Sequence, residues 1–391
     1  MNIQNNAVIN GRKIEMFHHE SGAEYGYKKP QTDSFAILYP KDYDETKSYP
    51  LYVVLHSAGH DMFSCLACVG KKGDHDIYDT PDDMFGLYPD CWRNKENGQN
   101  DWFWGGKPAN EDDRDERSTT ELMPVEKRVI DTVMWVFDNY PIDRERVYAV
   151  GNSMGGTGSL GVAVPRGDIF AAVKANVPAG VNHVLSRLGY EGDAPEGFKA
   201  PDLPVIVDYS SQTDQWSRGH ERLYRQVKDH KYAIMGFWGP YGHENDNERI
   251  ARYNDIVHSF DIGSVKLHEA YPAFTDATTD DVIPWPETLN HSEESGQVNA
   301  FFRWKVLRDE ADTFEIELRL LAQDEFDSRL TFPTESTADV TLRRLQKFSL
   351  SEGDEVSFTF GDVSGKTVTA DALTIPRLTV TTEPKVLKIT K

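Results

Sequence analysis

The first 260 residues alternate short apolar runs with longer stretches of helical periodicity. Apolar runs bounded by turn residues are typical of buried strands, and they occupy residues 34–40, 49–57, 146–152, 169–179, 203–211 and 232–239. Apolar positions recur at helical spacing in 124–140 and 218–230, and a third helix is expected at 157–164. Strands interleaved with helices predict a mainly parallel sheet covered on both faces.

The pattern changes after about residue 262. Helical periodicity fades, and apolar and polar positions alternate in short runs separated by turn-rich stretches. These runs occupy residues 299–307, 313–321, 338–348, 355–362, 372–380 and 385–390. Short alternating strands at this spacing predict an antiparallel β-sandwich. We therefore expect an α/β domain over 1–262, a connector with a first strand region over 263–298, and a β-sandwich accessory domain over 299–391.

Charge narrows the range of partners. The 391 residues include 42 Lys and Arg against 64 Asp and Glu, a formal charge of −22. Nucleic acid and an anionic bilayer are excluded as main partners, because both would be repelled. No apolar run approaches the roughly 20 residues of a membrane helix, and residues 1–17 lack an apolar signal core. The compartment stays open, secreted or periplasmic if a leader was removed and otherwise cytoplasmic, as does the oligomeric state.

The strongest chemical signal is a G-x-S-x-G pattern at residues 151–155, within the sequence GNSMGG. It follows the strand predicted at 146–152 and leads into the helix predicted at 157–164. The glycines permit a sharp turn, in which the serine adopts a strained conformation and projects its hydroxyl. We therefore expect Ser153 to be a nucleophile.

A serine hydroxyl needs a base, and the base needs an acid that orients it. Asp214 lies just past the strand predicted at 203–211, where enzymes built on parallel sheets place catalytic groups. Asp208 is the rival acid, but it lies inside that strand. His243 follows the strand predicted at 232–239, on a loop with small neighbours, and is the expected base.

An oxyanion requires two backbone amides. The first helical turn after the serine supplies one, from Met154. The second usually comes from the loop after an early strand, here Leu55-His56-Ser57-Ala58-Gly59-His60. We expect the amide of Ala58 to be this second donor.

Together these segments resemble the α/β-hydrolase superfamily over about residues 30–262. The motifs that carry the resemblance are HSAG at 56–59, GNSMGG at 151–156, SQTDQW at 211–216 and GPYGHE at 239–244. They are similar to the esterase branch, which includes polyhydroxybutyrate-depolymerase-like enzymes and the feruloyl and acetylxylan esterases of carbohydrate esterase family 1. Prolyl-oligopeptidase-type hydrolases are related members of the same superfamily. Ser57 departs from the pattern, since the family usually has glycine at that position of an H-G-x-G loop.

The resemblance implies an α/β-hydrolase fold, doubly wound around a mainly parallel sheet, and a serine carboxylic-ester hydrolase working through an acyl-enzyme. The implied substrates are acetyl or feruloyl esters of carbohydrate. The sandwich lies outside this resemblance and looks like a fibronectin-III or immunoglobulin-type accessory domain.

Aromatic residues suggest a substrate wall. Trp92, Trp102 and Trp104 lie within a polar insertion at 85–106, and Trp216 lies beside Asp214. Aromatic side chains in polar loops suit a ring-bearing or sugar substrate. The alternative is that they pin the loop to the body of the domain.

No metal or cofactor is expected. Cys65 and Cys68 form a C-x-x-C pair and Cys91 is the one other cysteine. A zinc site needs about four ligands, and a second such pair is absent from the sequence. Serine chemistry requires neither a metal nor a cofactor.

Two other functions remain open at this stage. A prolyl-oligopeptidase-like peptidase uses the same three residue types, but it commonly carries a β-propeller where this chain has about 30 residues. The chain could also be a carbohydrate-binding protein in which the hydrolase fold is incidental.

Overall fold

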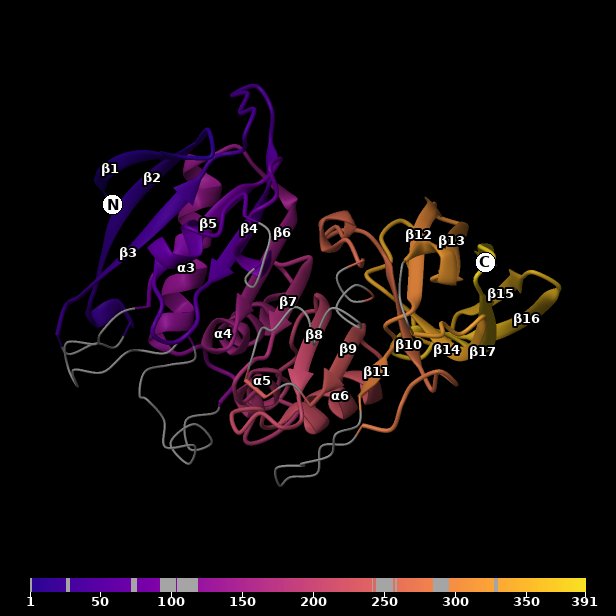
Figure 1. The fold of residues 1–391 in the computed structure, drawn as a ribbon. Helices are drawn as coiled ribbons and strands as arrows, with labels where there is room; N and C mark the ends of the chain where they lie inside the picture. The colour runs from indigo at the N-terminus through magenta and orange to yellow at the C-terminus, as the bar shows by residue number, and fades with distance from the viewer. Residues whose placement is uncertain are drawn as a thin grey trace.

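The computed structural model describes residues 2–25, 29–71, 76–91, 103, 119–240, 242–243, 256, 259–283, 295–326 and 330–391 (Figure 1). Trp92, Trp102 and Trp104, the predicted substrate wall, lie outside the described residues.

A 10-stranded sheet forms the first part of the chain, in the order β1-β2-β3-β5-β4-β6-β7-β8-β9-β11. Its strands are β1 (Asn2–Ile9), β2 (Arg12–Ser21), β3 (Gln31–Leu38), β4 (Tyr49–Leu55), β5 (Phe85–Pro89), β6 (Ile142–Asn152), β7 (Ala172–Asn176), β8 (Val205–Ser211), β9 (Ile234–Gly239) and β11 (Gly296–Val298). The run from β5 to β9 is parallel, whereas β1, β2, β3 and β11 add antiparallel edges. The expectation of a mainly parallel sheet is confirmed.

The longer helices cover one face of this sheet. They are α3 (Pro124–Asn139), α4 (Met154–Ala163), α5 (Asn182–Arg187) and α6 (His220–Asp229). Their apolar side chains share one core cluster with alternate residues of the central strands. Helix α4 begins three residues before the predicted start at 157, directly after Ser153. None of the helices within the described residues is long and apolar enough to cross a membrane.

The opposite face is covered differently. Short helix α1 (Met62–Leu66) and the 3₁₀ turn η2 (Asp76–Tyr78) pack there, together with side chains of the C-terminal half. The other 3₁₀ turns are η1 (Ala23–Tyr25), η3 (Val164–Arg166), η4 (Ile262–Ser264) and η5 (Gln323–Glu325).

The C-terminal half forms two antiparallel sheets, which confirms the predicted sandwich (Figure 1). One sheet has the order β10-β14-β17 and the other β12-β13-β18-β15-β16. The strands are β10 (Tyr271–Thr275), β12 (Phe302–Asp309), β13 (Thr313–Leu320), β14 (Glu335–Arg343), β15 (Glu355–Phe360), β16 (Val363–Val368), β17 (Leu373–Thr381) and β18 (Lys385–Thr390).

The segment 263–298, expected as a connector with a first strand region, contributes a strand to each half. In β10, Phe274 pairs with Val340 of the sandwich. In β11, Gln297 pairs with Phe237 at the edge of the large sheet. A single apolar cluster therefore runs from the large sheet through both sheets of the sandwich.

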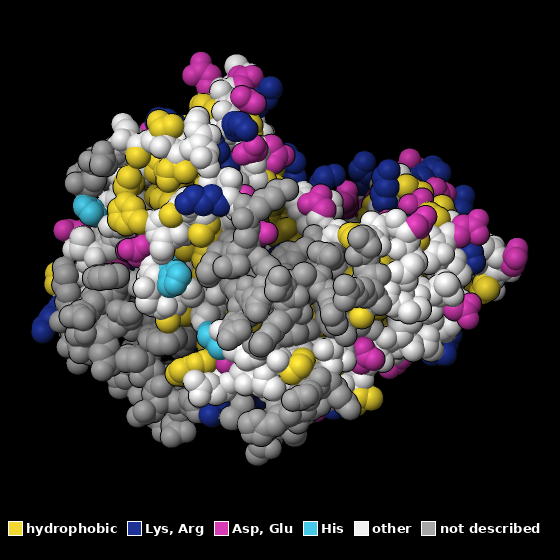
Figure 2. Space-filling view, viewed as in Figure 1, with side chains coloured by type: hydrophobic (Ala, Val, Ile, Leu, Met, Phe, Trp, Pro, Cys, Tyr) yellow, Lys and Arg dark blue, Asp and Glu magenta, His cyan; other side chains and the backbone are white. Residues whose placement is uncertain are grey.

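Polar contacts reinforce this junction. Arg344 Nη2 donates to the carbonyl oxygens of Gly167 at 2.8 Å, Asp202 at 3.1 Å and Phe170 at 3.2 Å. Figure 2 shows basic side chains interspersed with acidic ones along the rim between the two halves. Along this rim the acidic side chains therefore do not form one continuous patch.

Candidate active site

Ser153 stands at a sharp turn between β6 and α4, with φ 56° and ψ −118°. This backbone region is strained for a residue with a side chain. The turn lies so close to β4 that a Cβ on Gly155 would meet the Leu55 carbonyl oxygen at 1.9 Å. A Cβ on Gly151 would meet the carbonyl of Gly155 at 2.3 Å. The two flanking glycines are therefore required by close backbone packing, as the sequence pattern predicts.

Three side chains meet at the carboxyl end of the sheet. Ser153 Oγ lies 2.6 Å from His243 Nε2, and His243 Nδ1 lies 2.6 Å from Asp214 Oδ2. Asp214 is buried, whereas the His243 side chain is 32% exposed. A proton on Nδ1 donates to the carboxylate, which leaves Nε2 to accept from the Ser153 hydroxyl. This is the geometry that activates a serine by a neighbouring base.

Asp214 and His243 come from loops that are joined to each other. The Gly242 amide donates to Thr213 Oγ1 at 2.9 Å, and the Gln212 amide donates to the Gly239 carbonyl oxygen at 3.2 Å. Thr213 thus fixes the histidine loop to the acid loop. No sequence signal marked it, because a threonine beside an acid has many ordinary roles.

Asp208, the rival acid, serves a buried network on the face covered by the helices. Its Oδ2 accepts from Tyr224 Oη at 2.6 Å and from Ser210 Oγ at 2.8 Å. His220 Nδ1 lies 3.0 Å from Ser210 Oγ, and His220 Nε2 donates to the Pro178 carbonyl oxygen at 3.2 Å. The network therefore supports the loop after β7.

That loop, residues 177–181, links the turn at Ser153 to the loop that carries Asp214. The Ala179 amide donates to the Ser153 carbonyl oxygen at 3.3 Å. The Gly180 amide donates to the Trp216 carbonyl oxygen at 2.7 Å. The backbone on both sides of the site is thus held by one short segment.

The two expected oxyanion donors lie in suitable backbone settings. Met154 opens α4, where the first amides have no partner within the helix. In the loop after β4, the Ser57 amide donates to Tyr78 Oη at 3.1 Å and the His60 amide closes a turn on the Ser57 carbonyl oxygen at 3.1 Å. Within the described residues, the amides of Ala58 and Gly59 make no hydrogen bond. These two amides can therefore donate to a ligand.

Tyr78 holds the loop after β4 against the end of β6, which leads to Ser153. Its hydroxyl donates to Ser57 Oγ at 3.0 Å, and it also has a hydrogen bond with the Asn152 side chain. The Tyr88 hydroxyl donates to the Tyr78 carbonyl oxygen at 3.0 Å. Burial raises the pKa of Tyr78, so its phenol stays neutral and can both donate and accept. The departure at Ser57 thus has a structural partner that sequence reasoning missed.

Comparison with known families decides the class of the protein. A family model described as "Putative esterase" matches residues 30–259. The chain belongs to this esterase family. It is a serine esterase with an α/β-hydrolase domain followed by a β-sandwich.

A comparison with solved structures returned, among others, two hydrolases. An S-formylglutathione hydrolase from Agrobacterium tumefaciens is 14% identical over 63% of this chain and 93% of its own, with a TM-score of 0.42. A ferulic acid esterase of carbohydrate esterase family 1 from Anaeromyces mucronatus, solved with ferulic acid, is 17% identical over 68% of this chain and 98% of its own, with a TM-score of 0.42. A search of curated proteins found no match to this chain.

Trp216 is the one predicted substrate contact that falls within the described residues. Its amide donates to Asp214 Oδ1 at 2.8 Å, and the residue is 41% exposed. The backbone amide of Trp216 therefore binds the Asp214 carboxylate, while the exposed residue leaves its indole ring accessible to a ligand.

The cysteines of the esterase are free thiols. Cys65 and Cys91 are buried, and Cys68 is half-buried. Burial raises the pKa of the Cys65 thiol, which keeps it protonated. Across the described residues, no three His, Cys, Asp or Glu side chains gather as a metal site would require.

Proposed function

We propose that this esterase hydrolyses acyl or aryl esters of carbohydrate, with Ser153 as nucleophile, His243 as general base and Asp214 as the acid that orients it. The observation that carries the proposal is the unbroken contact from Ser153 through His243 to Asp214, with 2.6 Å at each step. A buried carboxylate at Nδ1 favours the tautomer in which Nε2 accepts a proton.

The reaction proceeds in two halves. In the first, His243 takes the hydroxyl proton as Ser153 Oγ bonds to the ester carbon, and the amides of Met154 and Ala58 bind the oxyanion. Each such donor contributes roughly 3–4 kcal/mol in comparable sites. His243 then gives the proton to the departing alcohol, leaving an acyl group on Ser153.

In the second half, water replaces the alcohol. His243 removes a proton from the water as it attacks the acyl carbon, and returns it to Ser153 Oγ as the acid leaves. The partial exposure of the His243 side chain agrees with this role, because water must reach the imidazole from solvent.

Two observations support a carbohydrate ester as the substrate. The motifs around Ser153, Asp214 and His243 resemble those of carbohydrate esterase family 1. The exposed ring of Trp216, next to the acid, suits the face of a sugar or aryl group.

A substrate panel tests the proposal. Wild-type protein and the Ser153→Ala variant are compared on acetylated, methylated and feruloylated sugars, on an aryl acetate and on a prolyl-amide chromogen. We expect ester cleavage by the wild type alone and no amide cleavage. Cleavage of the prolyl amide in preference to every ester would replace the proposal with a peptidase.

A further inference from the structure

The loop after β4 folds into a tight turn over residues 57–60. The His60 amide donates to the Ser57 carbonyl oxygen at 3.1 Å, which closes the turn. Gly59, at the third position of the turn, has φ 76°, a conformation that favours glycine. Ala58, Gly59 and His60 are exposed, so water competes with the hydrogen bond of the turn. That bond alone therefore stabilises the turn only modestly.

The Ser57 carbonyl and the Ala58 amide belong to one peptide group. This group is planar and trans, so its C=O and its N–H point in opposite directions. A contact that fixes the Ser57 carbonyl oxygen therefore also fixes the direction of the Ala58 N–H. Within the described residues this N–H makes no hydrogen bond, and it is the expected second donor to the oxyanion.

A buried side chain holds the same carbonyl from the other side. His56 Nδ1 lies 2.9 Å from the Ser57 carbonyl oxygen. A carbonyl oxygen can only accept, so we assign a proton to Nδ1. His56 is buried, so water does not compete for this hydrogen bond as it does for the bond of the exposed turn. The imidazole therefore restrains the Ser57 carbonyl more strongly than the turn can.

The imidazole is itself held at its other nitrogen. The Cys91 amide donates to His56 Nε2 at 2.9 Å, and Asp90 Oδ1 lies 3.1 Å from the same nitrogen. The Phe103 ring packs edge-on against the imidazole, with ring centroids 5.1 Å apart. Whichever of Cys91 and Asp90 binds Nε2, the proton on Nδ1 faces the Ser57 carbonyl. The orientation of the imidazole is therefore fixed by its surroundings.

This backbone lies in contact with the first turn of α4. A Cβ on Gly155 would meet the carbonyl oxygen of Leu55 at 1.9 Å and that of His56 at 2.8 Å. Gly155 directly follows Met154, which opens the helix and presents the other expected donor. The direction of the Ala58 amide therefore decides whether the two donors converge on one oxygen atom.

We propose that His56 is a positioning residue for the oxyanion site: by holding the Ser57 carbonyl through Nδ1, it directs the Ala58 amide toward the oxyanion. The proposal rests on the proposed function, in which Ser153 attacks an ester and the amides of Met154 and Ala58 bind the oxyanion. His56 contacts neither the substrate nor the reacting atoms. The oxyanion forms only as the ester carbon is attacked, so loss of this alignment should lower kcat and leave KM unchanged.

Two substitutions separate the two nitrogens of the imidazole. Asparagine places its amide nitrogen near the position of Nδ1, so His56→Asn keeps a donor to the Ser57 carbonyl. Glutamine reaches the position of Nε2, so His56→Gln keeps an acceptor for the Cys91 amide and loses the donor to Ser57. Both variants lose the ring contact with Phe103, so they share the same loss of packing.

Steady-state kinetics on an aryl acetate compares these variants. His56→Gln should lower kcat by about 10–100-fold with KM unchanged, less than removal of an oxyanion donor itself. His56→Asn should keep a kcat about tenfold above that of His56→Gln. An equal loss in both variants, or a larger loss in His56→Asn, would overturn the proposal. His56→Leu, which also lacks the donor, replaces His56→Gln if the latter does not fold.

An aryl trifluoromethyl ketone tests the oxyanion site apart from turnover. Ser153 Oγ adds to the ketone carbon, the hydroxyl proton passes to His243, and the ketone oxygen becomes an oxyanion bound by the two amides. His56→Gln should weaken this inhibition by the factor by which it lowers kcat. Inhibition by the corresponding trifluoromethyl alcohol, which forms no oxyanion, should not change. Undiminished inhibition by the ketone would contradict the proposal.

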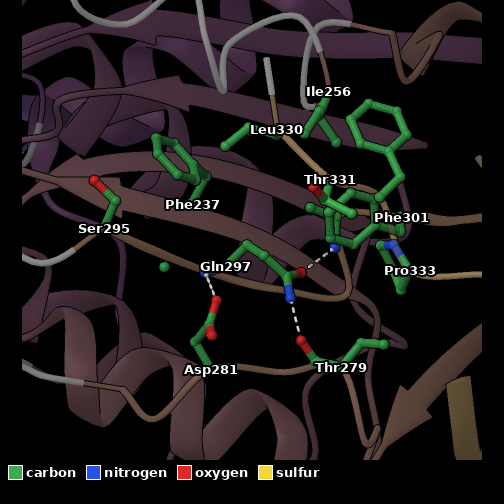
Figure 3. Close-up of a pocket in the computed structure, with 13 residues that line it drawn as sticks. Phe237, Ile256, Thr279, Asp281, Ser295, Gln297, Phe301, Leu330, Thr331 and Pro333 are labelled. Atoms are coloured by element: carbon green, nitrogen blue, oxygen red, sulfur yellow. Dashed lines mark hydrogen bonds between the residues drawn. The ribbon is translucent and has the colours of Figure 1, made fainter. Parts of the chain in front are cut away.

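Gln297 provides a matched control far from the loop after β4. It lines a cavity of about 390 Å³ between the large sheet and the sandwich, which Figure 3 shows. Like His56, it is buried and bridges two backbone groups: its Nε2 donates to the Thr279 carbonyl oxygen and its Oε1 accepts from the Ala300 amide. Gln297→Leu should leave kcat per folded molecule unchanged. A fall equal to that of His56→Gln would mean a general packing effect and would overturn the proposal.

Crystal structures of the wild type, His56→Asn and His56→Gln separate this proposal from the proposed function. We expect the Ser57 carbonyl to keep its direction in His56→Asn and the peptide group between Ser57 and Ala58 to rotate in His56→Gln. If the wild type cleaves no ester, the proposed function fails, yet these structures still decide whether His56 positions the peptide group. An unchanged peptide group in His56→Gln would exclude that role.

Discussion

Tyr78 and Ser57 exchange two hydrogen bonds: the Ser57 amide donates to the phenol oxygen at 3.1 Å, and the phenol donates to Ser57 Oγ at 3.0 Å. The same phenol has a hydrogen bond with Asn152, the residue before Ser153. The loop after β4 and the turn at Ser153 are therefore held by one side chain. The relative placement of Ala58 and Met154 depends on it.

Tyr78→Phe should lower kcat with a smaller effect on KM, because the Ala58 amide loses its fixed position toward the developing oxyanion. The expected loss is about 10–100-fold, less than removal of a donor itself. Steady-state kinetics on an aryl acetate measures it. Tyr88→Phe removes a hydroxyl that bonds the Tyr78 carbonyl and Thr80, and serves as the matched control. An equal drop in both variants would mean a general packing effect.

Ser153→Ala should abolish ester hydrolysis while the protein stays folded. Removal of a nucleophile in comparable serine hydrolases costs several powers of ten in turnover. Turnover of an aryl acetate and the circular dichroism spectrum are measured on the same sample. Activity above about a tenth of the wild-type rate would exclude Ser153 as nucleophile.

Asp214→Asn should lower turnover, whereas Asp208→Asn should mainly lower stability. Asp214→Asn leaves His243 without its orienting carboxylate, and turnover should fall by about 10³–10⁴-fold. Asp208→Asn disturbs the buried contacts with Tyr224 and His220. It should lower stability by about 3 kcal/mol, with turnover per folded molecule within about tenfold. Denaturant unfolding and kinetics on both variants check this, and the reverse ranking of turnover would move the acid to Asp208.

His19 should make stability depend on pH. Burial, with the Arg128 charge nearby, lowers the pKa of His19 from 6.5 to about 4. Between these values the unfolded chain binds a proton that the folded chain does not, so the free energy of unfolding falls as the pH drops from about 6.5 to 4. Denaturant unfolding across this range should show a shallower fall for His19→Gln. His18→Gln, an exposed neighbour on β2, is the control. Identical slopes in the two variants would assign the effect elsewhere.

A truncation after residue 262 should leave an insoluble protein. It removes β11, so the edge of β9 is exposed, and it uncovers the apolar face of the sheet that the sandwich covers. Yield in the soluble fraction and aryl acetate turnover measure this. A soluble fragment with full turnover would show that the catalytic part stands alone.

The central part of the site could be predicted from sequence because each piece has a local signature. Glycines at 151 and 155 mark the elbow through close packing that forbids a Cβ. Asp214 and His243 each follow a buried strand, and the strand order brings neighbouring ends together. Pattern and chain order were therefore enough to select three side chains that lie in contact in the structure.

Other features depend on contacts between distant segments. Tyr78 and Ser57 are 21 positions apart in the sequence, and no local sequence pattern predicts their contact. Val177, a β-branched residue with φ 35°, sits in the loop that holds Ser153, although propensity disfavours that conformation. Strand β11 has three residues, too few for a periodicity to be seen. Tertiary packing determines such features, and this packing cannot be predicted from a local sequence pattern.

The place of β11 in the chain also bears on synthesis. The ribosome completes Ser153, Asp214 and His243 well before it reaches residues 296–298, which close the edge of the same sheet. Until then one edge of strand β9 lacks a partner, and the apolar face that the C-terminal half covers is exposed. Its folding is therefore tied to the arrival of the C-terminal half, and the interval before that arrival is when a chaperone would have the most surface to bind.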